Sequence, residues 1–419
     1  MNKRKLTIGL FGFGVVGEGI YKVLQQTPSL NAEVVKVCVR QGNKLRAAPP
    51  DLFTTDPLSL LQDPEIDVVV ELIDNADDAF SIVSAALRTG KAVVSANKKM
   101  IAEHLPELLT LQKRYSNALL YEAAVCGSIP VIRNLEEYYD NDLLQSVCGI
   151  VNGSTNYILT KIITEGCSYR EALAAAQELG FAESNPALDV EGRDAANKLT
   201  ILLLHAYGII SHPSTILQLG ITHIDDSDPV YAEEKSYQIK LIAQARRLHN
   251  GKVAAFVLPQ FVTANSQLHF VADEYNGVII ESKLADKQFL YGKGAGRYPT
   301  SSAVISDLSA LRYGYRYEYK KLLNGAAYEI TNDYYLRIYL SCNSAEDINK
   351  GDFEWIDEWH STHNRQVIIG LIHASVLIEA KWFHNVSVSV IVMPDGIVEK
   401  EVISQKRSRK NSLHMGGVH

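Results

Sequence analysis

The sequence predicts an α/β fold in which a doubly wound parallel sheet is followed by two α+β regions. Short apolar strands alternate with helical patterns up to about Pro130, which is typical of parallel sheets whose strands are connected by helices. A glycine-rich turn joins the first strand to the first helix. After Pro130 the alternation stops, so the later regions are expected to be α+β.

Five strands and two helices are expected in the first region. The first strand lies within residues 5–14 and breaks into the glycine turn. The remaining strands are expected at 33–39, 68–72, 92–95 and 118–122, and the helices at 15–26 and 77–87. Thr89-Gly90 ends the second helix, as a glycine stop predicts.

The middle region is expected to carry the substrate, and the last region to form a small module of its own. Middle-region elements are a strand at 146–151, helices from Asn156, at 169–179 and at 194–207, and β-rich runs over 253–281. A helix at 301–311 precedes strand-like runs at 334–341, 367–371 and 386–392. The expected domains are 1–132 for the dinucleotide (completed by about 296–325), 133–295 for substrate binding and dimerisation, 326–400 for the small module, and a flexible tail at 401–419.

Composition narrows the class of protein. The chain has 419 residues, 47% hydrophobic and 21% charged, which is a globular balance that needs two or three domains. A net charge of −7, with basic residues clustered only in the tail, argues against a nucleic-acid partner. The longest apolar stretch, 201–210, is too short to span a bilayer, and the start lacks a signal peptide. Five scattered cysteines without metal spacing fit the reducing cytoplasm, where we expect the protein.

The glycine turn predicts a dinucleotide site. Its residues are Gly12, Phe13, Gly14, Val15, Val16 and Gly17, which match GxGxxG between a strand and a helix. Glycines allow the backbone to approach a pyrophosphate, which then binds the N–H groups of Val15, Val16 and their neighbours at the helix N-terminus. The alternative is an ordinary tight turn, but this context favours a Rossmann-type domain.

The end of the second strand indicates the cofactor. An acid there would bind the ribose diol of NAD, but this strand ends Cys38-Val39-Arg40, with Lys44 close behind. Arg40 can pair with a 2′-phosphate, so NADP is favoured and NAD remains possible. The alternative is a simple exposed arginine at the start of a loop.

Two lysines are candidate proton donors to a carbonyl oxygen. Lys98 follows a strand at the sheet edge where ligands of doubly wound sheets bind. Lys198 lies four residues after Asp194, so the two share a helix face. The alternative is a surface ion pair, but the apolar run 199–204 suggests that this face is buried.

Substrate-binding groups are expected in two further segments. Glu183 could hold an ammonium group, or be a solvated loop acid. The turn at 152–155 begins a helix and offers N–H groups to a carboxylate, or simply caps the helix.

Six motifs together resemble homoserine dehydrogenase over roughly residues 5–312. They are GFGVVGEG, SANKK, YEAAVCGSIP, GIVNGSTNYIL, GFAESNPALDVEGRDAANKL and YGKGAGRYPTSSAV. The resemblance implies reversible NAD(P)H-dependent reduction of L-aspartate 4-semialdehyde to L-homoserine, a step in the biosynthesis of threonine, methionine and isoleucine. It also implies a homodimer or higher homo-oligomer formed through the middle domain, without a membrane partner.

The resemblance implies a role for each matching residue. Lys198 resembles the proton donor and acceptor that Asp194 orients, and Lys98 resembles a second lysine near the nicotinamide; which lysine transfers the proton stays open. Glu183 resembles the ligand of the substrate amino group. The other implied substrate contacts are Gly153, Ser154 and Asp189, and the other implied cofactor contacts are Asn75 and Gly296. Glu122 with the carbonyls of Val125, Gly127 and Ile129 resembles a structural monovalent-cation site, with sodium the expected ion.

This chain departs from the family pattern at a few positions. Asp74-Asn75 replaces paired glycines, and Asp74 could alter how the cofactor fits. Ser154 replaces a threonine and Asn185 replaces an aspartate. The last region resembles an ACT regulatory domain but lacks its Asp-x-Pro-Gly turn, so an ACT-like fold without the usual threonine site is expected.

Two other functions remain to be weighed against this one. Another dehydrogenase, such as aspartate-semialdehyde dehydrogenase, would need an acylated cysteine, for which Cys126 is the candidate. A catalytically inactive amino-acid sensor would use the third domain, but it would not need Lys98, Glu183, Asp194 and Lys198 intact.

Overall fold

The computed structural model describes residues 5–42, 44–141, 143–323, 328–361, 365–400 and 403. The chain divides into two compact units. The first comprises Met1–Leu143, Asn197–Pro213 and Leu290–Ala327, and the second comprises Leu144–Ala196, Ser214–Phe289 and Tyr328–His419. Among the described residues, no helix is both long and apolar enough to cross a bilayer.

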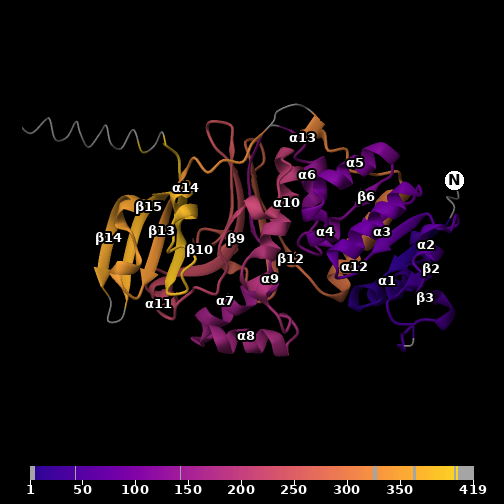
Figure 1. Cartoon of the computed structure of the whole chain (residues 1–419), viewed down its shortest axis with the longest axis horizontal. Coiled ribbons are helices and arrows are strands. Elements are labelled where there is room, and N and C mark those ends of the chain that lie inside the picture. Colours follow the sequence, from indigo (N-terminus) through magenta and orange to yellow (C-terminus); the bar gives the residue numbers. More distant parts are fainter. Residues whose placement is uncertain are drawn as a thin grey trace, which may run out of the picture. The chain divides into compact units, whose positions relative to one another are not determined.

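The first unit is built on a six-stranded parallel sheet with the strand order β3-β2-β1-β4-β5-β6. Figure 1 labels three of these strands, β2, β3 and β6. This is the Rossmann order, so the predicted fold class is confirmed. The strands are β1 (Leu6–Phe11), β2 (Ala32–Cys38), β3 (Phe53–Thr54), β4 (Val68–Glu71), β5 (Ala92–Ser95) and β6 (Leu119–Leu120). The sequence did not predict β3, because a two-residue strand has no periodicity to detect.

Helices and short 3-10 turns connect these strands. They are α1 (Val15–Gln26), η1 (Pro28–Leu30), η2 (Pro50–Leu52), α2 (Leu58–Leu61), α3 (Ala76–Arg88), α4 (Lys98–Glu103), α5 (Leu105–Tyr115), η3 (Glu122–Ala124) and α6 (Val131–Glu137). The chain returns to this unit with α12 (Arg297–Arg312) and α13 (Lys320–Leu323). A Cβ on Gly19 of α1 would lie 2.6 Å from Ser301 Oγ, so α1 and α12 pack closely.

The second unit contains most of a larger, mainly antiparallel sheet in the order β12-β11-β7-β9-β10-β16-β13-β15-β14, with β8 paired to β10. Its strands are β7 (Leu144–Ile150), β8 (Leu217–Gln218), β9 (Tyr237–Arg247), β10 (Val253–Thr263), β11 (Tyr275–Ser282), β12 (Asp286–Lys293), β13 (Tyr335–Cys342), β14 (Phe353–Ser361), β15 (Gln366–His373) and β16 (Val388–Val398). The helices and 3-10 turns are α7 (Gly153–Glu165), α8 (Tyr169–Glu178), α9 (Ala187–Val190), η4 (Pro213–Thr215), α11 (Ser227–Glu234), η5 (Gln267–Phe270), η6 (Ala345–Asp347), η7 (Lys350–Asp352) and α14 (Ala374–Glu379). Helix α10 (Arg193–Tyr207) begins in the second unit and ends in the first.

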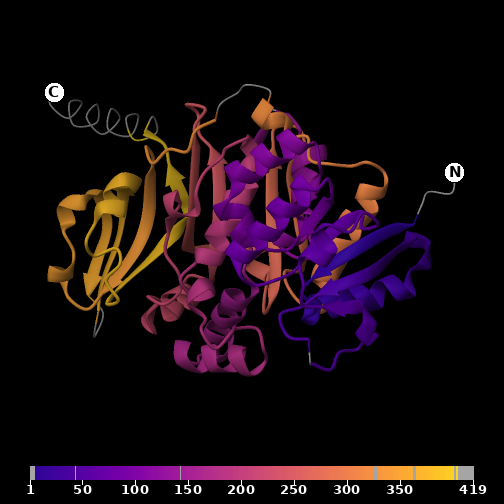
Figure 2. The same cartoon turned by 45° about the vertical axis from the view of Figure 1, so that its right-hand side comes forward.

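The C-terminal strands, drawn in orange and yellow in Figure 2, belong to the same sheet and unit as the middle region. The order β16-β13-β15-β14 is antiparallel throughout, and β16 continues the sheet beside β10. One apolar core joins Phe256 and Leu258 of β10 to Leu336 and Ile338 of β13. The expected third module therefore shares a core with the middle region, and its ACT-like character stays a prediction. Of the predicted tail, only residue 403 lies among the described residues.

Candidate functional site

A different structural feature explains each of the three glycines of the first turn. Gly12 has φ +92°, and a Cβ there would lie 2.8 Å from Leu72 O. A Cβ on Gly17 would lie 2.5 Å from Gly12 O, whereas Gly14 has open space around it. A tight turn, an open approach and close packing are what a dinucleotide pyrophosphate needs from this motif.

The N-terminus of α1 is available to an anion. Gly14 is its N-cap residue and has no side chain to bond the first N–H groups of the helix. Uncapped N–H groups and the positive end of the helix dipole attract phosphate. The turn and α1 line a groove of about 1210 Å³. Predicted cofactor residues that line it are Gly12, Gly14, Val15, Val16, Gly17, Arg40 and Asn75.

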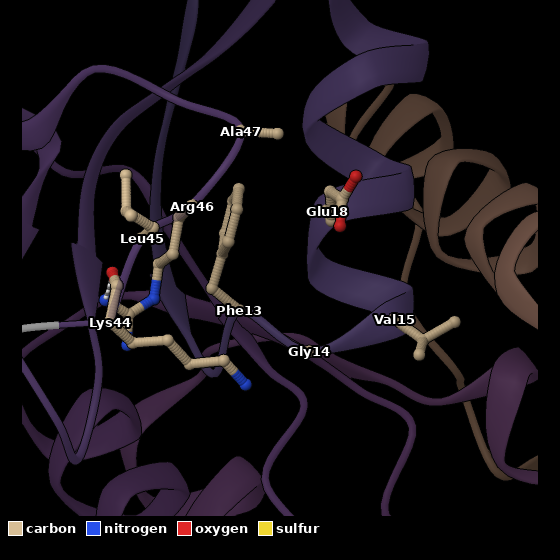
Figure 3. Close-up of a pocket in the computed structure, with 8 residues that line it drawn as sticks. All are labelled: Phe13, Gly14, Val15, Glu18, Lys44, Leu45, Arg46 and Ala47. Carbon is tan, nitrogen blue, oxygen red and sulfur yellow. Dashed lines mark hydrogen bonds between the residues drawn. The ribbon is translucent and has the colours of Figure 1, made fainter.

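Three cations surround the end of this groove beyond β2. Arg40, Lys44 and Arg46 all line it, and the exposed Arg40 side chain makes a weak ion pair with Asp78 at 3.4 Å. Figure 3 shows Lys44 and Arg46 on the loop facing the glycine turn, with the Phe13 ring between that loop and α1. The Arg46 guanidinium lies 5.0 Å from the Phe53 ring centre and donates to Lys44 O at 2.8 Å. Arg46 therefore braces the loop that carries Lys44.

Hydrogen bonds connect the groove to Lys98. Asn75 caps α3 by accepting the Asp78 N–H at 2.9 Å. Asn97 caps α4, whose first residue is the half-buried Lys98, and its amide donates to Ile73 O at 3.0 Å. The loop that carries Asn75 and the turn that carries Lys98 are thus tied together. Gly296, the N-cap residue of α12, has φ +118°, which favours glycine, and lies in the same unit.

Asn152 organises the predicted substrate residues of the second unit. Its side-chain carbonyl caps α7 by accepting the Thr155 N–H, and its amide nitrogen donates to Asp189 Oδ1 at 2.7 Å and Asp194 Oδ2 at 2.8 Å. Two carboxylates from α9 and α10 are therefore held at the N-terminus of α7. The sequence indicated the turn at 152–155 as a carboxylate site or a helix cap, but it did not predict these two bonds of Asn152, because both carboxylates are about forty residues away along the chain.

The start of α7 is closely packed. A Cβ on Gly153 would lie 2.5 Å from Glu274 O, so only glycine fits there. The Ser154 hydroxyl donates to Phe181 O at 2.5 Å, which connects α7 to the loop that carries Glu183. The Glu183 side chain is exposed, and its backbone carbonyl accepts the Gln177 amide at 2.9 Å.

Helix α10 carries Asp194 and Lys198 one turn apart. Their exposed fractions are 2% and 7%, so this face is buried, as the apolar run after Lys198 predicted. A buried carboxylate and ammonium at this spacing differ from a surface pair, because both have lost solvent screening.

The predicted cation residues lie around one buried turn of the first unit. Val125 and Ile129 are at most 2% exposed, and Cys126 and Gly127 have φ +57° and +51°. The Glu122 carboxylate accepts the Ile132 and Arg133 N–H groups at 2.9 Å, and burial raises its pKa to about 8. A Cβ on Gly127 would lie 2.5 Å from Gly294 O, so the turn packs against the segment before α12.

Comparison with known proteins identifies the family. Residues 130–309 match the family model for homoserine dehydrogenase, and residues 12–122 match that for the homoserine dehydrogenase NAD-binding domain. The homoserine dehydrogenase of Bacillus subtilis is 36% identical over 74% of this chain and 73% of its own length. The chain belongs to the homoserine dehydrogenase family.

Other homoserine dehydrogenases agree with this assignment. That of Synechocystis is 38% identical over 72% of this chain and 72% of its own length. The crystal structure of a homoserine dehydrogenase from Thiobacillus denitrificans superposes with a TM-score of 0.82 at 29% identity, covering 93% of this chain and 98% of that chain. The chain is therefore an NAD(P)-dependent oxidoreductase with a nicotinamide-dinucleotide domain. The alternative that needs an acylated cysteine lacks support, because Cys126 is fully buried.

The site residues predicted from the sequence of this homoserine dehydrogenase lie in two sets, one in each unit. The first unit holds the cofactor groove, Lys98 and Lys198, and the second holds Glu183, Asp189 and Asp194. The sequence did not predict the contacts of Arg46 and Glu71 or the bonds from Asn152 to two carboxylates. A polar residue at the end of a buried apolar strand is the signal that could have revealed Glu71.

Proposed function

We propose that this homoserine dehydrogenase interconverts L-aspartate 4-semialdehyde and L-homoserine with NADP, in the cytoplasm and within aspartate-family amino-acid biosynthesis. The observation that carries the proposal is the buried Asp194–Lys198 turn of α10, whose carboxylate accepts a hydrogen bond from Asn152. We expect a buried lysine with a carboxylate one helical turn away to supply an oriented ammonium group to a carbonyl oxygen.

The residues have separate tasks in the proposed reaction. The bound reduced nicotinamide supplies the hydride. Lys198 or Lys98 donates a proton to the oxygen of the aldehyde as its carbon is reduced, and Asp194 orients Lys198. Glu183 binds the substrate ammonium, while the N–H groups at the start of α7, in the Gly153–Thr155 turn, bind its carboxylate, with Asp189 beside them. Orientation of the two reactants and electrostatic stabilisation of the developing charge together contribute most of the rate.

The binding of NADP rather than NAD is proposed from Arg40 and Lys44. Both line the groove beyond β2, where the 2′-phosphate of a dinucleotide would lie, and the described part of that strand end has no carboxylate. The weak Arg40–Asp78 ion pair can be exchanged for a phosphate at little cost.

A structural monovalent cation, with sodium the expected ion, is proposed at the Glu122–Ile129 turn. The backbone carbonyls of Val125, Gly127 and Ile129 are hard oxygen donors of the kind that such ions bind. The left-handed φ of Gly127 supports this, because it turns the chain sharply between those carbonyls. A homodimer formed through the middle region, and an ACT-like C-terminal segment without a threonine site, also remain proposals.

The decisive experiment compares Lys198→Ala and Lys98→Ala with the wild type in steady-state oxidation of NADPH by aspartate semialdehyde. The variant that lacks the proton donor should lose about 100-fold or more in kcat, with NADPH affinity retained. Lys113→Ala, on an exposed part of α5, is the control. Full activity in both active-site variants would contradict the mechanism.

A further inference from the structure

Glu71 is a buried carboxylate at the carboxyl end of β4, with 0% of its surface exposed. Its Oε1 accepts the Ile73 N–H at 2.7 Å, and its Oε2 accepts the Ser95 hydroxyl at 2.6 Å. A carboxylate that is wholly removed from water is costly, so its retention needs a reason beyond filling space.

These hydrogen bonds belong to a closed ring. Ser95 Oγ accepts the Asn97 N–H at 3.1 Å, and the Asn97 amide donates to Ile73 O at 3.0 Å. Glu71, Ile73, Ser95 and Asn97 therefore close on one another across the ends of β4 and β5. We call these four residues the strand-end ring.

The strand-end ring connects three parts of the cofactor-binding unit. Ile73 precedes Asp74 and Asn75, which line the groove. Asn97 caps α4 immediately before Lys98. A Cβ on Gly12 would lie 2.8 Å from Leu72 O and 3.3 Å from Ile73 Cγ2. The loop at 72–75 therefore also packs against the glycine turn. A displacement of Glu71 would move all three parts.

We propose that Glu71 is a positioning residue that fixes the groove loop at 72–75 and the Lys98 turn in one geometry through the strand-end ring. Its side chain is buried and is not among the residues that line the groove, so it acts through Ile73, Ser95 and Asn97. The inference rests on the proposed role of Lys98 for its effect on kcat, but not for its effect on cofactor binding.

The test uses Glu71→Leu and Ser95→Ala in the full chain. Glu71→Leu removes both acceptors, and Ser95→Ala cuts the bond to Asn97 while keeping Glu71 bonded to Ile73, so it is the milder variant if the first does not fold. Because small displacements of reacting groups cost about 100-fold in rate, Glu71→Leu should lower kcat by roughly that factor and Ser95→Ala by less. The Kd for NADPH, followed by its fluorescence, should rise in both, while the KM for the semialdehyde stays unchanged.

Ser84→Ala is the matched control, since it removes another buried hydroxyl of the same unit, on α3, outside the ring. It should leave kcat and the NADPH Kd at wild-type values. A purely structural brace would lower the melting temperature of the Glu71 and Ser95 variants yet leave kcat and Kd of the folded enzyme unchanged, and this result would overturn the proposal. Lys98→Ala is measured in parallel. If this variant keeps full kcat, the proposed role of Lys98 is wrong. In that case the NADPH Kd of the Glu71 and Ser95 variants alone tests the positioning role of Glu71, and an unchanged Kd would overturn it.

Discussion

At the scale of single residues, the chemistry of this protein depends on where charges are buried and where they stay in water. Arg40 is exposed and weakly paired, so it is available to a ligand. Glu71, Asp194 and Lys198 are buried, so each needs specific partners. Asn152 supplies one such partner by bonding two carboxylates with a single amide group.

Arg40→Ala should change the choice of cofactor. A charge-assisted bond between a guanidinium and a phosphate contributes about 1.5–3 kcal/mol, so the KM for NADPH should rise by about 10-fold or more. The KM for NADH should not change, because NADH lacks the 2′-phosphate. Arg88→Ala, at the exposed end of α3, is the control. Equal effects on both cofactors would argue against a phosphate contact.

Glu71 should make stability depend on pH. Burial, with a smaller contribution from Asp74, raises its pKa from 4.5 to about 7. The folded state therefore binds more protons than the unfolded state between these values, and this contribution to the free energy of unfolding falls as pH rises. Gln does not titrate, so Glu71→Gln should gain stability relative to wild type between about pH 5 and pH 8 in urea denaturation. A difference that is constant with pH would contradict the raised pKa.

At the scale of elements, α10, which carries Lys198, is held in place at its C-terminal end. Its last turn contributes His205, which is 1% exposed and bonds Glu136 of α6 at 2.6 Å and the Tyr121 hydroxyl at 2.9 Å. Burial acts to raise the pKa of Glu136, but His205 and Lys321 more than offset this and lower it. The end of the helix after Lys198 is therefore anchored within the first unit.

Removing one partner of this buried hydrogen bond should be destabilising. Glu136→Leu leaves the His205 ring nitrogen without its carboxylate partner, and an unsatisfied buried polar group costs about 1–3 kcal/mol. Guanidinium denaturation would measure the effect, with the exposed neighbour Glu137 changed to Leu as the control. If both variants unfold at the same concentration, the pair does not anchor α10.

At the scale of the whole molecule, the chain is built on two sheets. The parallel sheet of the first unit presents the cofactor groove beyond its strand ends, as open α/β sheets do. The larger sheet joins the middle region to the C-terminal strands through one apolar core. The C-terminal segment is thus part of the body of the second unit.

Truncation tests this shared core. A chain that ends at residue 327 would expose Phe256 and Leu258 of β10, which share an apolar core with β13, so the second unit should aggregate or lose cooperative unfolding. A chain that ends at residue 403 keeps the described C-terminal strands and is the matched control. Calorimetry and light scattering would measure both chains. Normal folding of the shorter chain would show that the last strands form an independent module.

The sequence by itself determined the features that depend on neighbouring residues. Helix, strand and turn geometry is set locally, so these features leave short-range patterns in the sequence. They include the alternation of strands and helices, the glycine turn before α1, the helix cap at Asn152 and the family motifs. The burial of Asp194 and Lys198 was also predictable, since they are one turn apart on α10 and an apolar run follows them.

Only the tertiary structure decided which distant groups meet. Several contacts join residues that lie 24 to 69 positions apart. They are the bonds of Asn152 to two carboxylates, the Glu71–Ser95 bond of the strand-end ring and the His205–Glu136 bond. The inclusion of β13–β16 in the sheet of the middle region is likewise a long-range event. Such contacts leave no periodic trace in the sequence, because they form when packed elements bring their ends together and buried polar groups must find partners there.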